Sequence, residues 1–290
     1  MRPGQKHHYI PVFYLKYWAG PDGRLCEFSR PHQRAVPKRV HPSGTGYVRG
    51  LYTFPEVGPG QADFLETEFM KKADDLAAVA LRRMQQHDLD FSADVRTGWS
   101  RFLLSLLHRS PEAMERAWKR VSDKYAETVD GIRDQYASIR GPTDPETVEE
   151  FRATVMPFAI RRFLVDHVMR IIDSEGIGPH LNGMIWSVTT LHDPRHSLLT
   201  SDRPLVMTNG LGREDGHLVL PIGPNRVFMA ANNKRTMQQI HSIIRSGNLS
   251  DTLNDRVAVQ ARKFVYATTD SQLRFVEKRL GARERNSPWE

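Results

Sequence analysis

The sequence predicts an α+β fold in which a central helical bundle lies between an N-terminal and a C-terminal strand-rich part. Short β-like runs bounded by Gly, Pro and Ser fill residues 9–53. Apolar residues then recur at intervals of three and four through residues 62–172, and strand-like runs return after residue 183. The two strand-rich parts can share one mostly antiparallel sheet. We therefore divide the chain into residues 1–60, 61–182 and 183–290, which can also form one integrated domain.

The expected elements follow from these patterns in chain order. In the N-terminal part, YIPVFYL, RLCEFSR, RAVPKRV and YVRGLYTF are the predicted strands, and PEVGPG at 55–60 is the predicted linker. Helical spacing then predicts helices over 62–86, 93–108, 111–139, 145–154 and 158–172. After residue 183 we expect the strands MIWSVTTL, SLLTSD, PLVMT, LVLPI and RVFMAA, followed by helices over 234–246 and 249–265 and a frayed C-terminal tail.

The composition is that of a globular protein, with 290 residues, 39% hydrophobic and 26% charged. Cys26 is the single cysteine, so no intramolecular disulfide can form, which indicates a reducing compartment. The N-terminus lacks the uninterrupted apolar core of a signal peptide, and no stretch approaches the roughly 18 apolar residues of a membrane span. We expect a cytoplasmic protein without a membrane partner. Walker, dinucleotide-binding, HExxH and nucleophile-elbow motifs are absent from the sequence.

The net charge of +7 is concentrated in the first 50 residues, which hold nine Lys and Arg side chains against two acidic ones. Because basic groups can hold phosphates and aromatic rings can stack on bases, this segment makes nucleic acid a candidate partner. The alternative is that the aromatic residues belong to the core while the basic groups stay solvated. The aromatic residues concerned are Tyr9, Phe13, Tyr14, Tyr17 and Trp18.

Lys6, His7, His8 and Tyr9 form the densest cluster of chemically useful side chains. Adjacent residues of a strand point to opposite faces, so only one of the two histidines can serve a given site. A histidine can act there as a general base or a metal ligand. Two neighbouring histidines are not a zinc site by themselves, because zinc requires further ligands.

Ser201 and Asp202 stand before Arg203 and Pro204 in a second candidate cluster, between two predicted strands. The favoured interpretation is a turn in which Asp202 accepts hydrogen bonds from nearby backbone N–H groups. Asp202 could also be a metal ligand or a general base, with Ser201 positioning a substrate. Both roles are compatible.

Arg109 ends the apolar helix predicted over 93–108. The favoured interpretation is that its side chain satisfies the terminal carbonyl groups of that helix. The alternative is a bidentate clamp on a phosphate or carboxylate.

Four segments together resemble an uncharacterised bacterial family of domains of unknown function, of the DUF4238 type. They are KHHYIPVFYLKYWA at 6–19, Arg-Ser-Pro at 109–111, TSDRPLVM at 200–207 and LPIGPNRVFMA at 220–230. This chain has His7 where members often have Gln, and Arg203 where they usually have Asn, which favours His8 over His7 as the functional residue. The resemblance implies a bacterial cytoplasmic protein and no particular activity.

Two hypotheses follow from these residues. In the first, the protein is a nucleic-acid-processing hydrolase of nuclease type, such as a toxin or defence effector, with His8, Asp202 and Arg109 as catalytic residues. In one version of this hypothesis, His8 and Asp202 bind a divalent metal ion. The expected substrate-binding residues are Lys6, His7, Tyr9, Lys16 and Ser201. In the second, the basic segment belongs to a non-enzymatic adaptor that binds nucleic acid, a protein partner or a second copy of the chain.

Overall fold

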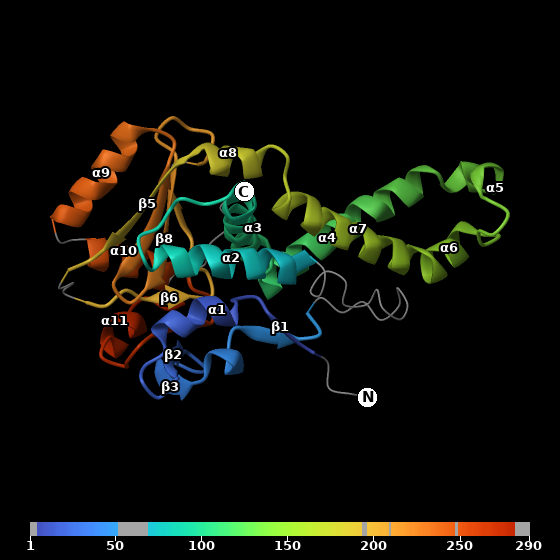
Figure 1. The fold of residues 1–290 in the computed structure, drawn as a ribbon. Coiled ribbons are helices and arrows are strands. Elements are labelled where there is room, and N and C mark those ends of the chain that lie inside the picture. Colours follow the sequence, from blue (N-terminus) through green and yellow to red (C-terminus); the bar gives the residue numbers. More distant parts are fainter. Residues whose placement is uncertain (1–4, 52–68, 193–195, 209, 247–248, 282–290) are drawn as a thin grey trace.

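Strands from both ends of the chain form one antiparallel sheet in the structure, a computed structural model that describes residues 5–51, 69–192, 196–208, 210–246 and 249–281. Its order is β3-β2-β10-β6 (Figure 1). The C-terminal strand β10 pairs with the N-terminal β2 on one side and with β6 on the other. The strands are β2 (Leu25–Ser29), β3 (Val36–Val40), β6 (Thr200–Ser201) and β10 (Phe264–Ala267).

A second four-stranded antiparallel sheet has the order β5-β9-β8-β7. Its strands are β5 (Ile185–Thr190), β7 (Val206–Thr208), β8 (His217–Gly223) and β9 (Arg226–Ala231). A two-stranded ribbon joins β1 (Lys6–His8) to β4 (Tyr47–Arg49). The architecture is therefore α+β, as predicted, with strands from both ends of the chain in one sheet.

The helices lie beside the sheets and in an arm that extends away from them. The arm consists of α4 and α7, with α5 and α6 at its tip (Figure 1). The helices are α1 (Val12–Leu15), α2 (Lys71–Met84), α3 (Ala93–His108), α4 (Pro111–Gly131), α5 (Tyr136–Ile139), α6 (Val148–Thr154), α7 (Met156–Ile172), α8 (Ile177–Gly183), α9 (Lys234–Arg245), α10 (Leu249–Gln260) and α11 (Leu273–Glu277). Short 3₁₀ turns are η1 (Lys16–Trp18), η2 (Pro42–Gly44) and η5 (Arg133–Gln135). None of the helices among the described residues combines the length and the apolarity needed to span a bilayer.

The predicted strand over residues 9–15 is wrong, because the chain forms the helical turn α1 and then η1 there. Pro11 stands at the N-cap with an extended backbone, and the turn starts directly after it. Ile10, Tyr14 and Trp18 are fully buried and stand at intervals of four, a helical spacing that the strand interpretation overlooked. Tyr14 and Trp18 are therefore core residues and are not available to stack on a base.

The predicted helix over 249–265 is wrong at its end, since α10 stops at Gln260 and β10 begins at Phe264. The apolar run of β10 is buried on both faces in the middle of a sheet, so it lacks the alternation that marks a half-buried strand. The helix predicted over 93–108 is confirmed as α3, capped by the Ser92 hydroxyl. The predicted linker at 55–60 and the first part of the helix over 62–86 lie outside the described residues.

Candidate functional site

The β1–β4 ribbon presents the two histidines to opposite sides. In the register of the pair, His8 stands opposite Tyr47 and Lys6 opposite Arg49. His7 is fully buried, whereas His8 is half-buried. This alternation follows from the pleat of a strand and leaves His8 as the histidine that faces out of the core.

His8 lies among cationic groups. Its ring is 5.4 Å from the Tyr47 ring, and the Lys6 ammonium lies 4.3 Å above the same Tyr47 ring while it donates to the Ser43 carbonyl at 3.1 Å. Burial lowers the pKa of His8, and the charges of Lys6 and Arg109 lower it further, against a hydrogen bond to the Ser43 backbone that raises it. The imidazole is therefore neutral at physiological pH.

The Nε2 atom of His8 is buried and has no hydrogen-bond partner among the described residues. In a neutral imidazole one ring nitrogen carries the proton and the other keeps a lone pair, so Nε2 is an acceptor in one of the two tautomers. A buried acceptor of this kind costs free energy unless it meets a donor.

Arg109 is the C-cap of α3, and its guanidinium is almost fully buried at 1% exposure. Nη1 lies 3.0 and 3.2 Å from the two carboxylate oxygens of Asp74 in α2. The favoured prediction, a side chain that satisfies helix carbonyls, misses this ion pair, because α2 and α3 pack side by side in a way that local sequence does not report. The Arg109 charge adds a small lowering to the pKa of His8, which burial lowers most.

Ser110 and Pro111 separate α3 from α4. The Ser110 hydroxyl accepts a hydrogen bond from the Ala113 backbone at 3.2 Å, and Pro111 occupies the first turn, where its missing N–H costs nothing. The Arg-Ser-Pro segment is thus a helix stop followed by a helix start, and it delivers Glu112 to the same region as Asp202 and Tyr9.

Asp202 follows β6 directly, and its carboxylate accepts hydrogen bonds from the backbone where α10 is followed by β10. Its Oδ1 accepts from the Arg262 backbone N–H at 2.9 Å, and Oδ2 accepts from Lys263 at 2.6 Å and Phe264 at 3.2 Å. Burial raises the pKa of Asp202 to about 6, although the three N–H groups favour the carboxylate. The Ser201 hydroxyl accepts from the Arg203 backbone at 3.1 Å. The predicted turn is present at Ser201, but the predicted local partners of Asp202 are wrong, because its carboxylate accepts from N–H groups some sixty residues away in the chain.

Glu112, whose role the sequence did not suggest, and Tyr9, one of the expected substrate-binding residues, lie near Asp202. Glu112 Oε2 lies 4.0 Å from Arg203 Nη2, and the charges of Arg262 and Arg116 act on the Arg203 guanidinium, whose pKa is lowered chiefly by burial. Tyr9 is 3% exposed; burial raises its pKa, and the charges of Asp202 and Glu112 raise it further. A single sequence does not predict that residues 9, 112 and 202 lie close together.

The remaining predicted site residues are placed as follows. Lys16 is exposed on η1, and Ser201 is fully buried. Across the described part of the chain, no three or more His, Cys, Asp and Glu side chains gather closely enough to hold a metal ion. His8 and Asp202 therefore have no third protein ligand of these types there, and Asp202 already uses both oxygens for backbone N–H groups.

The ribbon, the Arg-Ser-Pro segment and the Ser-Asp turn all lie within the span of a single family model. The model of a family described as "Protein of unknown function (DUF4238)" matches residues 6–271. The chain belongs to this family. No curated protein and no solved structure matches it. The DUF4238 pattern thus includes His8, Arg109 and Asp202 but carries no assigned activity.

Proposed function

We propose that this DUF4238 chain is a nucleic-acid-processing hydrolase of nuclease type in which His8 is the catalytic base. The observation that carries the proposal is the buried, unpartnered Nε2 of a neutral imidazole beside the charges of Lys6 and Arg109. Catalytic bases are found where environment moves a pKa away from its ordinary value, and cationic surroundings suit an anionic phosphodiester.

The chemistry requires one proton acceptor and positive potential. His8 Nε2 takes a proton from water as the water oxygen bonds to phosphorus, the phosphorus–oxygen bond to the leaving nucleoside breaks, and the leaving oxygen is protonated from solvent. Lys6 stabilises the charge on the phosphate oxygens through its potential. Arg109 is paired with Asp74, so we assign Arg109 and Asp202 to positioning the site.

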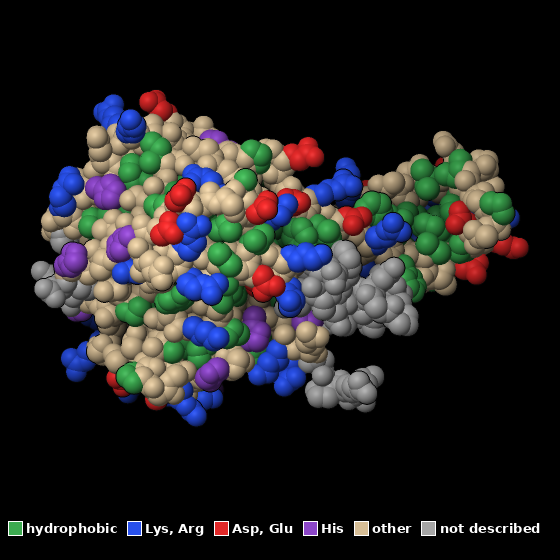
Figure 2. All heavy atoms as spheres, viewed as in Figure 1, with side chains coloured by type: hydrophobic (Ala, Val, Ile, Leu, Met, Phe, Trp, Pro, Cys, Tyr) green, Lys and Arg blue, Asp and Glu red, His purple; other side chains and the backbone are tan. Residues whose placement is uncertain are grey.

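The surface around the ribbon suits a polyanion. Figure 2 shows Lys and Arg side chains gathered over β1, next to histidine. Lys6 and Arg49 are opposite one another across the two strands, and Arg49 is exposed. Neighbouring Lys and Arg side chains of this kind bind phosphates with an affinity that falls as the salt concentration rises. Together with this activity, we propose that the protein acts in the bacterial cytoplasm as a toxin or defence effector.

A second function is favoured by the hydrogen bonds of Asp202. Both of its oxygens accept backbone N–H groups, which leaves His8 without an assigned acidic partner. Many catalytic histidines are oriented by a carboxylate. A protein that binds nucleic acid through the ribbon without cutting it is therefore the alternative proposal.

The test is an assay that records cleavage and retention together. Labelled single- and double-stranded DNA and RNA are incubated with wild type, His8→Ala and the control His32→Ala, with and without Mg²⁺, Mn²⁺ or Zn²⁺. His32 is an exposed histidine between β2 and β3. We expect cleavage that is lost in His8→Ala and kept in His32→Ala. Retention without cleavage supports the alternative, and neither retention nor cleavage overturns both.

A further inference from the structure

The arm that extends from the sheets buries apolar side chains where α4 and α7 meet (Figure 1). Met114 of α4 lies in one buried cluster with Leu164 and Val168 of α7, and Val129 lies in another cluster nearer the tip. Two helices cover only the faces that they turn to each other. Apolar side chains on their other faces therefore need a further layer to cover them.

Such side chains are present on the arm. Ile139, Phe158 and Phe163 are 54%, 44% and 54% exposed, and they are three of the five large hydrophobic side chains that are exposed among the described residues. Figure 2 shows hydrophobic side chains along the arm as far as its tip. A single exposed apolar residue is ordinary on a protein surface, but a group of them on one projecting element indicates an interaction surface.

A groove of about 520 Å³ lies between α4 and α7. Val121 and Tyr125 of α4 and Phe163 of α7 are its apolar part. The rings of Tyr125 and Phe163 lie 5.6 Å apart, and Tyr125 is only half-buried. The groove can therefore receive an apolar side chain between the two helices.

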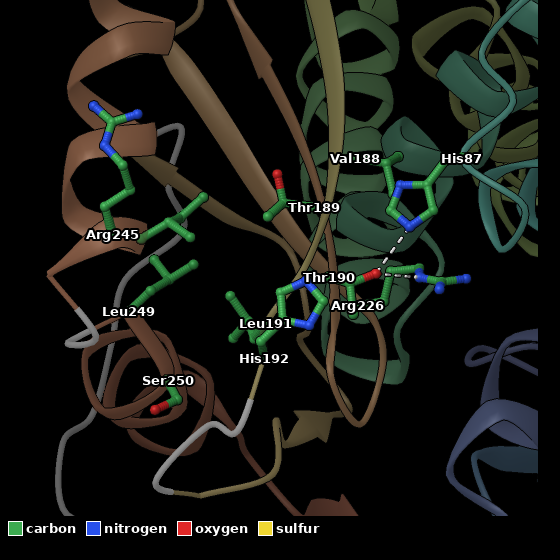
Figure 3. Close-up of a pocket in the computed structure, with 11 residues that line it drawn as sticks. His87, Val188, Thr189, Thr190, Leu191, His192, Arg226, Arg245, Leu249 and Ser250 are labelled. Atoms are coloured by element: carbon green, nitrogen blue, oxygen red, sulfur yellow. Dashed lines mark hydrogen bonds between the residues drawn. The ribbon is translucent and has the colours of Figure 1, made fainter.

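A larger cavity of about 750 Å³ beside β5 and α9 differs from this groove (Figure 3). There His87 Nε2 and Arg226 Nε lie 2.9 and 3.2 Å from the Thr190 hydroxyl. Arg245 points away from these three side chains in Figure 3. The polar groups of that cavity bond to one another and do not converge on a ligand, whereas the rings of the arm are exposed.

The charge of the arm changes sign along its length. Arg120, Lys124 and Arg170 line the groove, and Asp166 is the acidic residue among the described lining. Residues 127–150, which run from the end of α4 through the tip into α6, hold seven acidic side chains against two basic ones. Figure 2 shows acidic side chains at the tip. The arm is therefore basic at the groove and acidic towards its tip.

We propose that this face of the arm binds a second copy of the chain, with the two arms antiparallel about a two-fold axis so that their four long helices form a bundle. The groove of one copy then meets the groove of the other, and each Phe163 ring enters the facing groove. The acidic tip of each arm lies over the basic part of the other arm, and the symmetry repeats this attraction at both ends. A parallel pair would instead oppose like charges.

The face is large enough for such a contact. With 21 residues in α4 and 17 in α7, the two helices are about 25–30 Å long at about 1.5 Å per residue. Two helices side by side are about 20 Å wide, so each copy presents roughly 600 Å². Two copies together bury about 1,200 Å², which is the lower end of the range for specific interfaces. We therefore expect a dimer that dissociates on dilution. The groove contains none of the residues assigned to the His8 site, so this inference does not depend on the proposed hydrolase.

Sedimentation velocity of the full chain over a wide range of concentrations tests the proposal, and wild type should pass from monomer to dimer as the concentration rises. Phe163→Asp should weaken the dimer at least about tenfold, because the symmetric interface then buries two unpaired carboxylates. The Phe163 side chain is already mostly exposed, so the monomer should stay folded. Ile243→Asp is the matched control, since Ile243 is 47% exposed on α9, on the side of the molecule away from the arm (Figure 1). It should dimerise as wild type does.

Charge reversal tests the antiparallel order. Arg120→Glu with Arg170→Glu makes the groove acidic, and Glu127→Lys with Asp134→Lys makes the part towards the tip basic; all four side chains are exposed. Each double variant should dimerise at least about tenfold more weakly than wild type, because like charges then face each other. The chain with all four changes should regain the dimer, since an acidic groove then faces a basic tip.

The proposal is overturned if wild type stays monomeric at every concentration, or if Phe163→Asp dimerises as tightly as wild type. It is also overturned if the two double variants dimerise as wild type does, or if the chain with all four changes stays monomeric. Circular dichroism and thermal unfolding verify that each variant is folded.

Discussion

The hydroxyl groups of Tyr14 and Thr200 lie 2.8 Å apart, and Tyr14 also donates to the Pro221 carbonyl at 2.7 Å. All three residues are buried, and they come from three separate segments of the family pattern. The FYL segment, the TSDRP segment and the LPIG segment therefore meet at one phenol. This contact connects α1 to β6, the strand that ends at Ser201 directly before Asp202.

Tyr14→Phe should therefore lower the free energy of unfolding by about 1–3 kcal/mol, since it leaves a buried hydroxyl and a buried carbonyl without their partner. Tyr17→Phe is the control, because Tyr17 is only half-buried. Denaturant unfolding of the two variants gives the comparison. Equal losses in both would show that the Tyr14 hydroxyl does not join the segments.

The pair of Arg109 and Asp74 should be much more strongly coupled than the pair of Lys71 and Asp75 in the same helix. Arg109 is 1% exposed, whereas Lys71 and Asp75 are about 70% exposed and 3.3 Å apart. Removing one member of a buried pair costs about 3–5 kcal/mol, and exposed helix pairs contribute about 0.3–0.5 kcal/mol.

Double-mutant cycles with Arg109→Met and Asp74→Asn, and with Lys71→Ala and Asp75→Ala, measure both couplings by denaturant unfolding. A coupling for Arg109 and Asp74 no greater than that of the exposed pair would contradict the assignment of Arg109 as a buried positioning residue. Such a result would favour the alternative prediction, in which Arg109 clamps a phosphate or carboxylate.

Asp202 gives the protein a pH dependence of known sign. Its pKa in the folded protein is about 6, above the ordinary value for Asp. The folded protein then binds the proton more tightly than the unfolded chain, so this group's contribution to stability is complete below the ordinary pKa and is lost as pH rises through about 6. Asp202→Asn removes this dependence.

The difference in unfolding free energy between wild type and Asp202→Asn should therefore shift against wild type as pH rises from about 4 through 6. Asn also turns an N–H group towards backbone N–H donors, which adds a loss that does not vary with pH. Denaturant unfolding at a series of pH values separates the two effects. A difference that is constant with pH would contradict the raised pKa.

Salt dependence tests whether the ribbon binds phosphates. If Lys6 neutralises one phosphate, Lys6→Gln should reduce the slope of log K against log salt by about 0.7 for a single strand and about 0.9 for a duplex. Lys278→Gln, an exposed change at the end of α11, should leave the slope unchanged. Fluorescence anisotropy with labelled oligonucleotides gives both slopes, and equal slopes would place the interface elsewhere.

The sequence was informative where structure is local. Helix α3 follows from its apolar spacing, the Ser92 cap and Pro111 beyond its end, and the opposed faces of His7 and His8 follow from the strand period. The pairing of strands that lie far apart in the chain could not be predicted from the sequence. β10 continues an apolar helix-like run and becomes a strand only because β2 and β6 flank it.

The candidate site shows the same division. The turn at Ser201 and Asp202 was predicted from residue types, but its acceptor role towards residues 262–264 depends on tertiary contact. Asp74 and Glu112 were missed because each meets its arginine across separate elements.

The role of His8 as catalytic base is tested by the initial rate of nucleic-acid cleavage by wild type and His8→Ala across about pH 5 to 8. Because the pKa of His8 is lowered, we expect a rate for wild type that rises with pH, with a midpoint below the ordinary histidine value of about 6.5. We also expect this pH dependence to disappear in His8→Ala. Cleavage by His8→Ala with the same pH profile as wild type would contradict His8 as the catalytic base.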